Sequence, residues 1–305
     1  MNLFLSLLTK LIPLYFLILL GFIAGKKLNA KKETIASILI YVVAPIVIFN
    51  SIISTKITVE IMVLPLMFFL VCCFISIMFY FIGTRFFKDS TKNLLALCAG
   101  TANTGYFGIP VAIGLLGEQA IGLMIIGIIG FTAFENSLGF FIAANGNYTA
   151  KEALLKLLKL PTIYAFILGV VFNILGFNSV GEYATFSRNF IGAYTILGMM
   201  LVGLGLSDMR RFGFDLKFLL LTFLAKFIVW PLTILLLVYI DNTSLNLFND
   251  LVHKVMILLS IVPLAANAVA FSSELKIHPE KAALAVFIST LIALFYIPFV
   301  VMIIF

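Results

Sequence analysis

Two short stretches of an otherwise apolar chain place amide and hydroxyl side chains beside glycine and proline, and chemistry could occur there. They hold six candidate binding residues: Asn103, Thr104, Gly105, Pro110, Pro263 and Asn267. Inside a helix, glycine costs about 1 kcal/mol and proline about 3 kcal/mol relative to alanine. The pattern therefore predicts two helix breaks. The helix that restarts after a break has free N–H groups at its positive end, which favours an anionic ligand.

Two ionisable residues, Glu135 and Lys226, lie in the middle of apolar runs. A central lysine costs about 2.5–3.5 kcal/mol on the membrane-insertion scale, so such residues usually face a cavity or a partner. We interpret them as coupling residues: Lys226 takes the place of a bound cation, and Glu135 pairs with it or carries a proton. The alternatives are that Lys226 extends to the membrane interface and that Glu135 only makes a structural hydrogen bond.

The composition indicates that lipid surrounds most of the protein. Of 305 residues, 63% are hydrophobic and 11% are charged, and the mean hydropathy is +1.20. Soluble chains carry about 25% charged residues. The net charge of +7 is spread in small groups without a basic stripe, which argues against a nucleic-acid partner. The three cysteines lack zinc-site spacing, and we expect neither a metal nor a cofactor.

The apolar residues form ten runs, each near the length of about 20 residues that a membrane helix needs. The runs are 7–25, 34–53, 60–83, 93–116, 120–143, 161–176, 187–206, 216–240, 251–275 and 282–304. The sequence therefore predicts an all-α integral membrane protein with ten transmembrane helices. The amphipathic stretch 151–160 is expected to lie at the membrane interface or to form a simple linker.

The lysines and arginines indicate the orientation in the membrane. Fifteen of the twenty fall in the connections that follow the odd-numbered runs, and four fall on the other side. Positive charge accumulates on the cytoplasmic side of membrane proteins. We therefore expect a multi-pass protein of the cell membrane, plasma or inner, with both termini extracytoplasmic.

Ten runs divide into two halves of five, and an odd number of spans inverts the second half. Glu118 and Glu280 occupy matching places in the two halves, and each follows a polar, interrupted run. The predicted organisation is a first repeat over 1–143, an interfacial connection over 144–160 and an inverted second repeat over 161–305. Paired interrupted spans point to the binding site of a secondary transporter. Alternatively, the glycines and prolines serve only close helix packing.

Several segments resemble the auxin efflux carrier family, which includes plant auxin exporters and bacterial malate/malonate-type carriers. They include LLGFIAGKKL, YVVAPIVIFNSI, ANTGYFGIPVAIGLLGEQA, PTIYAFILGVVFNILG and VPLAANAVAFSSEL. The resemblance implies a fold like that of the bile-acid/sodium symporters, with broken helices four and nine crossing. It also implies a scaffold of helices one, two, six and seven, an elevator-like movement of the other six, and a homodimer. The crossing would carry the six candidate binding residues.

The sequence therefore favours a secondary active transporter of a small organic anion such as a carboxylate, driven by protons or sodium. A channel or receptor is an alternative, although ten spans in inverted halves suit alternating access better. An intramembrane enzyme is a weaker alternative, because the chain has no HExxH motif and its GLGLSD segment differs from the GxGD of aspartyl proteases.

Overall fold

Every regular element in the described part of the chain is a helix. The computed structural model describes residues 3–144, 161–177, 182–207 and 214–305, and within these ranges no strand occurs. In lipid, a helix satisfies its backbone polar groups without water, which explains this choice for so apolar a sequence. The predicted interfacial stretch 151–160 lies outside the described residues, as does nearly all of the connection 144–160.

The helices of the first part of the chain follow the predicted runs closely. They are α1 (Leu3–Leu28), α2 (Lys32–Ile38), η1 (Leu39–Val43), α3 (Ala44–Ile53), η2 (Ile61–Val63), α4 (Leu64–Phe86), α5 (Thr91–Gly100), η3 (Thr104–Gly108), α6 (Ile109–Leu116), η4 (Glu118–Ala120), α7 (Ile121–Phe134), η5 (Glu135–Gly139) and α8 (Phe140–Ala143). Consecutive elements such as α2, η1 and α3 form one continuous rod, because η1 is a π-helical turn within it.

The helices of the second part also follow the predicted runs, with two differences. Its helices are α10 (Pro161–Ile174), α11 (Glu182–Ser207), α12 (Leu216–Leu224), η6 (Ala225–Val229), α13 (Trp230–Ile240), η7 (Asp241–Leu245), α14 (Asp250–Ile261), α15 (Asn267–Glu274) and α16 (Pro279–Ile304). The sixth expected span is the shorter helix α10. The ninth is divided between α14 and α15.

Eight helical runs in the described residues are long and apolar enough to cross a membrane. They are Phe4–Leu28, Lys32–Ile53, Ile61–Phe86, Thr91–Leu116, Glu118–Ala143, Phe186–Ser207, Leu216–Leu245 and Pro279–Ile304. These eight correspond to eight of the ten predicted spans. The fold is thus all-helical and multi-pass, and the count of ten stays a prediction.

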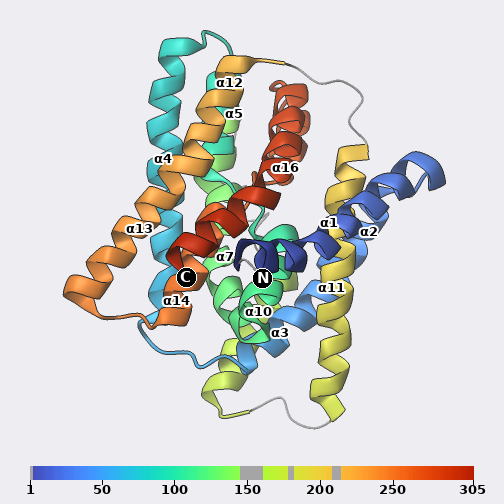
Figure 1. Cartoon of the computed structure of the whole chain (residues 1–305), viewed down its shortest axis with the longest axis vertical. Helices are drawn as coiled ribbons and strands as arrows, with labels where there is room; N and C mark the ends of the chain where they lie inside the picture. Colours follow the sequence, from blue (N-terminus) through green and yellow to red (C-terminus); the bar gives the residue numbers. More distant parts are fainter. Residues whose placement is uncertain (1–2, 145–160, 178–181, 208–213) are drawn as a thin grey trace.

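The helices form two flanks around a central group (Figure 1). α1, α2 and α11 lie together on one side, α4, α12 and α13 lie on the opposite side, and α5, α7 and α16 lie between them. α1 and α11 cross closely because both present glycine at the contact. A Cβ on Gly21 would collide with the backbone of Met200, and one on Gly203 with the backbone of Ile18. Such close contacts between small residues hold membrane helices together where lipid removes the hydrophobic driving force.

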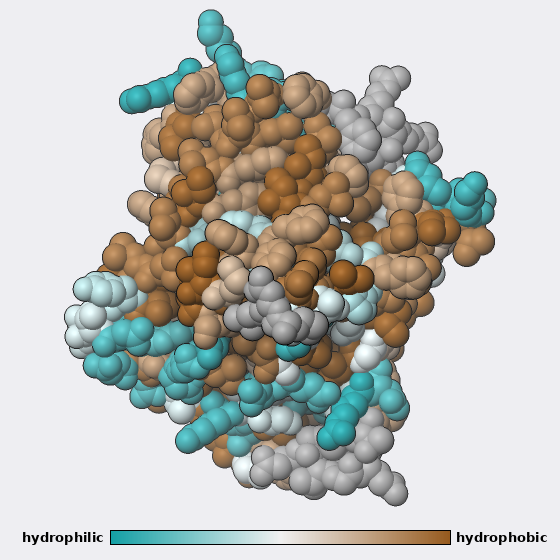
Figure 2. Space-filling view, viewed as in Figure 1, coloured by the Kyte–Doolittle hydropathy of each residue, from teal (hydrophilic) through white to brown (hydrophobic). Residues whose placement is uncertain are grey.

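The outer surface is suited to lipid. Figure 2 shows hydrophobic side chains over most of the upper and middle part of one face, with hydrophilic residues gathered near its top and its lower part. Helix α16 illustrates the pattern, since Leu291, Phe295, Phe299 and Ile303 are all exposed and recur every fourth residue. Residues at this spacing share one helix face. In a bilayer this face contacts acyl chains.

Three helices widen into π-helical turns at positions that carry predicted site residues. Thr104 and Gly105 lie in η3, Glu135 begins η5, and Lys226 lies in η6. Such turns occur frequently at functional sites. In η6 a proline contributes to the widening, because Pro231 has no N–H to donate to the carbonyl of Phe227, four residues earlier. The hydroxyl of Tyr296 in α16 donates to that carbonyl, of Phe227, over 2.6 Å.

Candidate functional site

The two predicted helix breaks exist, and they meet in space. The chain is non-helical between α5 and η3 and again between α14 and α15. At the meeting point, the backbone N–H of Asn103 donates to the carbonyl of Pro263 over 2.9 Å. One broken helix therefore supplies the partner that the other one lacks. We call this arrangement the crossing.

Backbone groups freed by the breaks find partners on other helices. The indole N–H of Trp230 in α13 donates to the carbonyl of Ala99 over 2.7 Å. The hydroxyl of Ser289 in α16 accepts the N–H of Leu264 over 3.2 Å. Unpaired backbone groups at membrane depth cost several kcal/mol. These contacts explain how irregular backbone is tolerated here and why the crossing has a fixed geometry.

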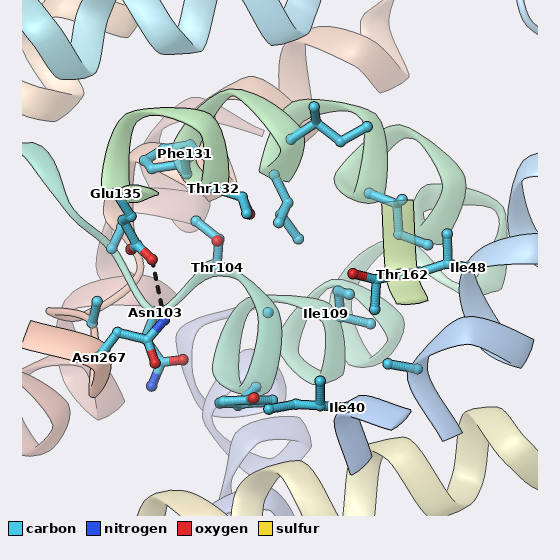
Figure 3. A pocket seen from close by; sticks show the side chains of 18 of the residues that line it. Ile40, Ile48, Asn103, Thr104, Ile109, Phe131, Thr132, Glu135, Thr162 and Asn267 are labelled. Atoms are coloured by element: carbon cyan, nitrogen blue, oxygen red, sulfur yellow. Dashed lines mark hydrogen bonds between the residues drawn. The ribbon is translucent and has the colours of Figure 1, made fainter. Parts of the chain in front are cut away.

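A cavity of about 590 Å³ lies beside the crossing. Its polar lining residues are Asn103, Thr104, Tyr106, Thr132, Glu135, Asn136, Thr162, Tyr194 and Asn267. The rest of its wall is mainly isoleucine, valine, alanine and phenylalanine from α3, α7, α10 and the crossing itself. Figure 3 shows Glu135, Asn267, Asn103 and Phe131 at one end, and Ile40, Ile48, Ile109 and Thr162 at the other. The labelled carboxylate and amide side chains thus gather at one end, which would suit the polar head of a ligand.

Glu135 and Asn267 join the end of α7 to the second broken helix. The Asn267 amide Nδ2 donates to Glu135 Oε2 over 3.1 Å (Figure 3). The Glu135 side chain projects from η5, and the residue is only 6% exposed. Among the described residues that line the cavity, Glu135 is the one acidic residue, and none is lysine, arginine or histidine.

The Asn103 side chain has an unused hydrogen-bond donor. Asn103 is 4% exposed, and its Nδ2 has no hydrogen-bond partner in the part of the chain that the structure describes. A buried donor left unsatisfied costs about 1–3 kcal/mol. The cost would be recovered by a ligand acceptor, such as a carboxylate oxygen, beside the crossing.

Lys226 lies in a different environment from Glu135. It is fully buried, so the alternative in which it extends to the membrane interface is wrong. Its Nζ lies 5.1 Å from the centre of the Trp230 ring and has no hydrogen-bond partner among the described residues. The alternative of direct pairing with Glu135 is therefore not observed, since the carboxylate instead accepts from Asn267. Nor does Lys226 line the cavity.

The chain is similar to known transport proteins over nearly its whole length. The model of a family described as membrane transport protein matches residues 6–147 and 148–301. This chain belongs to that family, which is of the auxin efflux carrier type. An uncharacterized transporter of Methanocaldococcus jannaschii is 29% identical over 294 residues, which cover 92% of this chain and 93% of the relative. A second, from Methanothermobacter thermautotrophicus, is 24% identical over 288 residues, with 92% and 93% covered.

Within this transporter, the fold brings together most of the predicted site residues. Asn103, Thr104, Gly105 and Asn267 all line the cavity, and Glu135 lines it with them. The predicted prolines and Lys226 are placed elsewhere. Pro110 is in the first turn of α6, and Pro263 is in the second break, where its carbonyl accepts from Asn103. Lys226 lies beside Trp230.

The transporter's cavity also includes residues that the sequence did not single out. Thr132 lies three residues before Glu135 and four residues before Asn136, and this helical spacing could have identified Thr132. Tyr194 had no such signal. It comes from α11, and its hydroxyl would lie 3.3 Å from a Cβ placed on Gly105. Only the packing of α11 against the crossing brings it there.

Proposed function

We propose that the protein is a secondary active transporter of a small organic anion, and that the anion binds in the cavity beside the crossing. The observation that carries this proposal is the buried Asn103 amide: the residue lies in the wall of a ligand-sized cavity, and its Nδ2 has no hydrogen-bond partner among the described residues. A carboxylate oxygen would accept from it. The apolar part of the wall would hold the carbon skeleton of the anion.

An anion can bind here without a cationic side chain in the cavity. The helical run from Thr104 to Leu116 starts at the crossing, and the first N–H groups of a helix have no intrahelical partner. These groups and the helix dipole favour negative charge at its N-terminus. Thr104 and Gly105 are the first residues of this run. The N–H of Thr104 donates to the carbonyl of Ala102 over 2.8 Å, so the donor that Thr104 offers is its hydroxyl.

Glu135 is proposed to couple transport to protons. An ionised carboxylate on the same cavity wall would repel a bound organic anion, so binding of the anion favours the protonated form of Glu135. The anion and the proton would then cross together. Glu135→Gln keeps a polar side chain near Asn267 and removes the titrating group. We expect this variant to exchange substrate across the membrane but to lose accumulation driven by a pH gradient.

Lys226 is proposed to replace a bound cation behind the crossing. It is fully buried beside Trp230, and Trp230 holds the carbonyl of Ala99 at the end of α5. A fixed positive charge there makes sodium unnecessary. We therefore expect wild-type transport to proceed equally in sodium and in choline buffers, and a strict sodium requirement would contradict the role of Lys226.

We further propose ten spans in two inverted halves, 1–143 and 161–305, that move as a scaffold and an elevator-like bundle. Two features support the count: α10 is apolar, and α14 with α15 makes a broken ninth span. The two family-model matches also meet inside the connection 144–160. The proposal includes a homodimer in the cell membrane with extracytoplasmic termini. A reporter fused after Phe305 that is active in the cytoplasm would contradict this topology.

Thermal-shift measurements on the purified protein test the substrate class. The probes are succinate, butyrate and indole-3-acetate, each with and without sodium. We expect a carboxylate with an apolar body to raise the melting temperature more than succinate, because most of the cavity wall is apolar. If no carboxylate shifts the melting temperature and none is taken up by proteoliposomes, the proposed function is wrong.

Paired asparagine variants test the site. Asn103→Ala should weaken carboxylate binding by about 1–3 kcal/mol, because it removes a donor that only the ligand uses. It should not lower the melting temperature of the empty protein, because the unsatisfied donor is removed with the side chain. Asn267→Ala should also weaken binding, but it removes the partner of Glu135 and should lower that temperature. Asn242→Ala, on an exposed turn, is the matched control. Unchanged affinity in both cavity variants would refute the site.

A further inference from the structure

A second, smaller cavity of about 260 Å³ lies between α3, α7 and α11. It is far more polar than the central one, and the residues that matter most are Asn50, Ser51, Ser54, Glu118, Ser187 and Arg188. They come from the end of α3, the start of the α7 segment and the first part of α11. These three segments lie on the side of the protein that the predicted topology places outside the cell.

The small cavity is stacked directly on the central one. Both are lined by the same three helices, with Val47 and then Asn50 along α3, and Ile125 and then Ile121 along α7. On α11, Tyr194 lines the central cavity, and Ile191, three positions earlier, lines the small one. A helix rises 1.5 Å per residue, so the lining residues of the two cavities are about 5 Å apart along these helices.

The end of α3 packs tightly against α7 between these cavities. A Cβ on Gly122 would collide with the Thr55 side chain and would lie 2.9 Å from the carbonyl of Ser51. Val47 and Ile121 are each 1% exposed, so the wall between the cavities is closed to solvent at these positions. A solute that approaches along these helices from the end of α3 would therefore meet the small cavity before the crossing.

Asn50 is the feature that indicates a ligand. It is 3% exposed, and both its Nδ2 and its Oδ1 have no hydrogen-bond partner among the described residues. Other polar groups near it are satisfied. Asn173 donates to the carbonyls of Ile52, Ile53 and Thr55 at 2.7–3.0 Å. Buried amides are nearly always hydrogen-bonded, so an amide with two unused groups in a cavity wall points to a polar partner.

The charged groups at the mouth of this cavity fit a carboxylate. Arg188 Nε lies 4.0 Å from Glu118 Oε2, and their side chains are 69% and 55% exposed. Such a long, exposed ion pair contributes little to stability. The guanidinium can therefore turn to a ligand, and its planar donors match a carboxylate in a bidentate manner.

We infer that the small cavity is a second binding station for the transported carboxylate, on the outer approach to the crossing. Arg188 holds the carboxylate at the mouth, and the amide of Asn50 binds a polar group or a water of the ligand deeper in the cavity. This inference rests on the proposed function, because it concerns the same substrate. It adds a station that the crossing residues do not form.

Uptake into proteoliposomes from each face tests the inference, with succinate, butyrate and indole-3-acetate as probes. Asn50→Leu and Arg188→Gln should raise the Michaelis constant about tenfold for entry from the face that bears residues 54–60. They should leave entry from the opposite face unchanged. Lys56→Gln removes an exposed positive charge on the same face and is the matched control. An unchanged constant in both variants, or an equal rise from both faces, would overturn the inference.

A labelling measurement makes the test independent of transport. Ser54→Cys places a thiol in the wall of the small cavity, where a membrane-impermeant maleimide can reach it. The native cysteines are buried or half-buried within helices, so the parent protein gives the background. The probes should slow labelling, and they should still do so when Asn103→Ala is added. Protection that disappears with Asn103→Ala would show a single central site and refute the second station.

These outcomes separate the two proposals. If the wild type transports a probe and Asn103→Ala impairs it while Asn50→Leu and Arg188→Gln do not, the second station is wrong and the proposed function stands. If the wild type transports none of the probes and no probe protects Ser54→Cys, both proposals fail.

Discussion

Replacing Lys226 should raise stability and abolish transport at the same time. The residue is fully buried, its Nζ has no hydrogen-bond partner among the described residues, and it lies over the face of Trp230, 5.1 Å from the ring centre. A lysine at the centre of a membrane helix costs about 2.5–3.5 kcal/mol. A desolvated cation–π contact returns about 2 kcal/mol. Lys226→Met removes both, for a net gain of about 0.5–1.5 kcal/mol.

This gain corresponds to a melting temperature higher by roughly 1–6 °C, since 1 kcal/mol shifts a chain of 150–250 residues by about 2–4 °C. Lys226→Gln keeps a buried polar group and should melt close to the wild type. Both variants should lose most transport in proteoliposomes, because a fixed charge is missing. Lys217→Met, on an exposed position of α12, is the control and should change neither property.

The two measurements together distinguish a functional from a structural lysine. When a residue that is kept for function at the expense of stability is replaced, the stability rises and the activity falls. A lower melting temperature in Lys226→Met would show that the ammonium stabilises the fold, and the magnitudes above would be wrong. Normal transport by Lys226→Gln would remove Lys226 from the mechanism and leave the crossing as the proposed site.

Two further predictions concern the contacts that hold the broken helices and the helix starts. Trp230→Phe leaves the carbonyl of Ala99 without its 2.7 Å donor and should lower the free energy of unfolding by about 1–3 kcal/mol in detergent, with equal expression as the check on folding. The carboxylate of Asp215 accepts a hydrogen bond from Lys281 at 2.8 Å. Burial raises the pKa of Asp215, but Lys281 and the N–H of Phe218 have a larger effect in the opposite direction, so this pKa lies below its ordinary value. Because this pKa is lowered on folding, the contact stabilises the protein above about pH 4 and is lost as the pH falls through the folded pKa. The melting-temperature difference between wild type and Asp215→Asn should therefore narrow below about pH 4, and a difference independent of pH would contradict the ion pair.

The sequence predicted the helix breaks because their cause is local. Glycine and proline disfavour helix wherever they stand, so the clusters that contain Gly105, Pro110 and Pro263 indicated the breaks without knowledge of the fold, although Gly105 and Pro110 lie in the helical run that follows the first break. The mid-run position of Glu135 and Lys226 was equally visible, because a charge at membrane depth is costly in any arrangement. The sequence also predicted eight of the spans that the structure describes, from the length of each apolar run.

The partners of these residues could not be read in the same way. Glu135 and Lys226 look alike in sequence, yet one contacts Asn267 at the cavity and the other lies against Trp230 behind the crossing. The difference depends on which helix faces which, and apolar faces of membrane helices carry little information about their neighbours. Asn50 was missed for the same reason, since its isolation becomes apparent only when every neighbour is placed.

The sequence by itself determined where helices run, where two of them break and which charged residues lie at membrane depth, because these follow from backbone preference and solvation of individual segments. Only the tertiary structure decided that the N–H of Asn103 meets the carbonyl of Pro263, and that Tyr194 and Glu135 face one cavity. Those contacts join segments separated by up to 160 residues. Close packing of small residues and the need to satisfy each freed backbone group select that arrangement, and neither acts within a single segment.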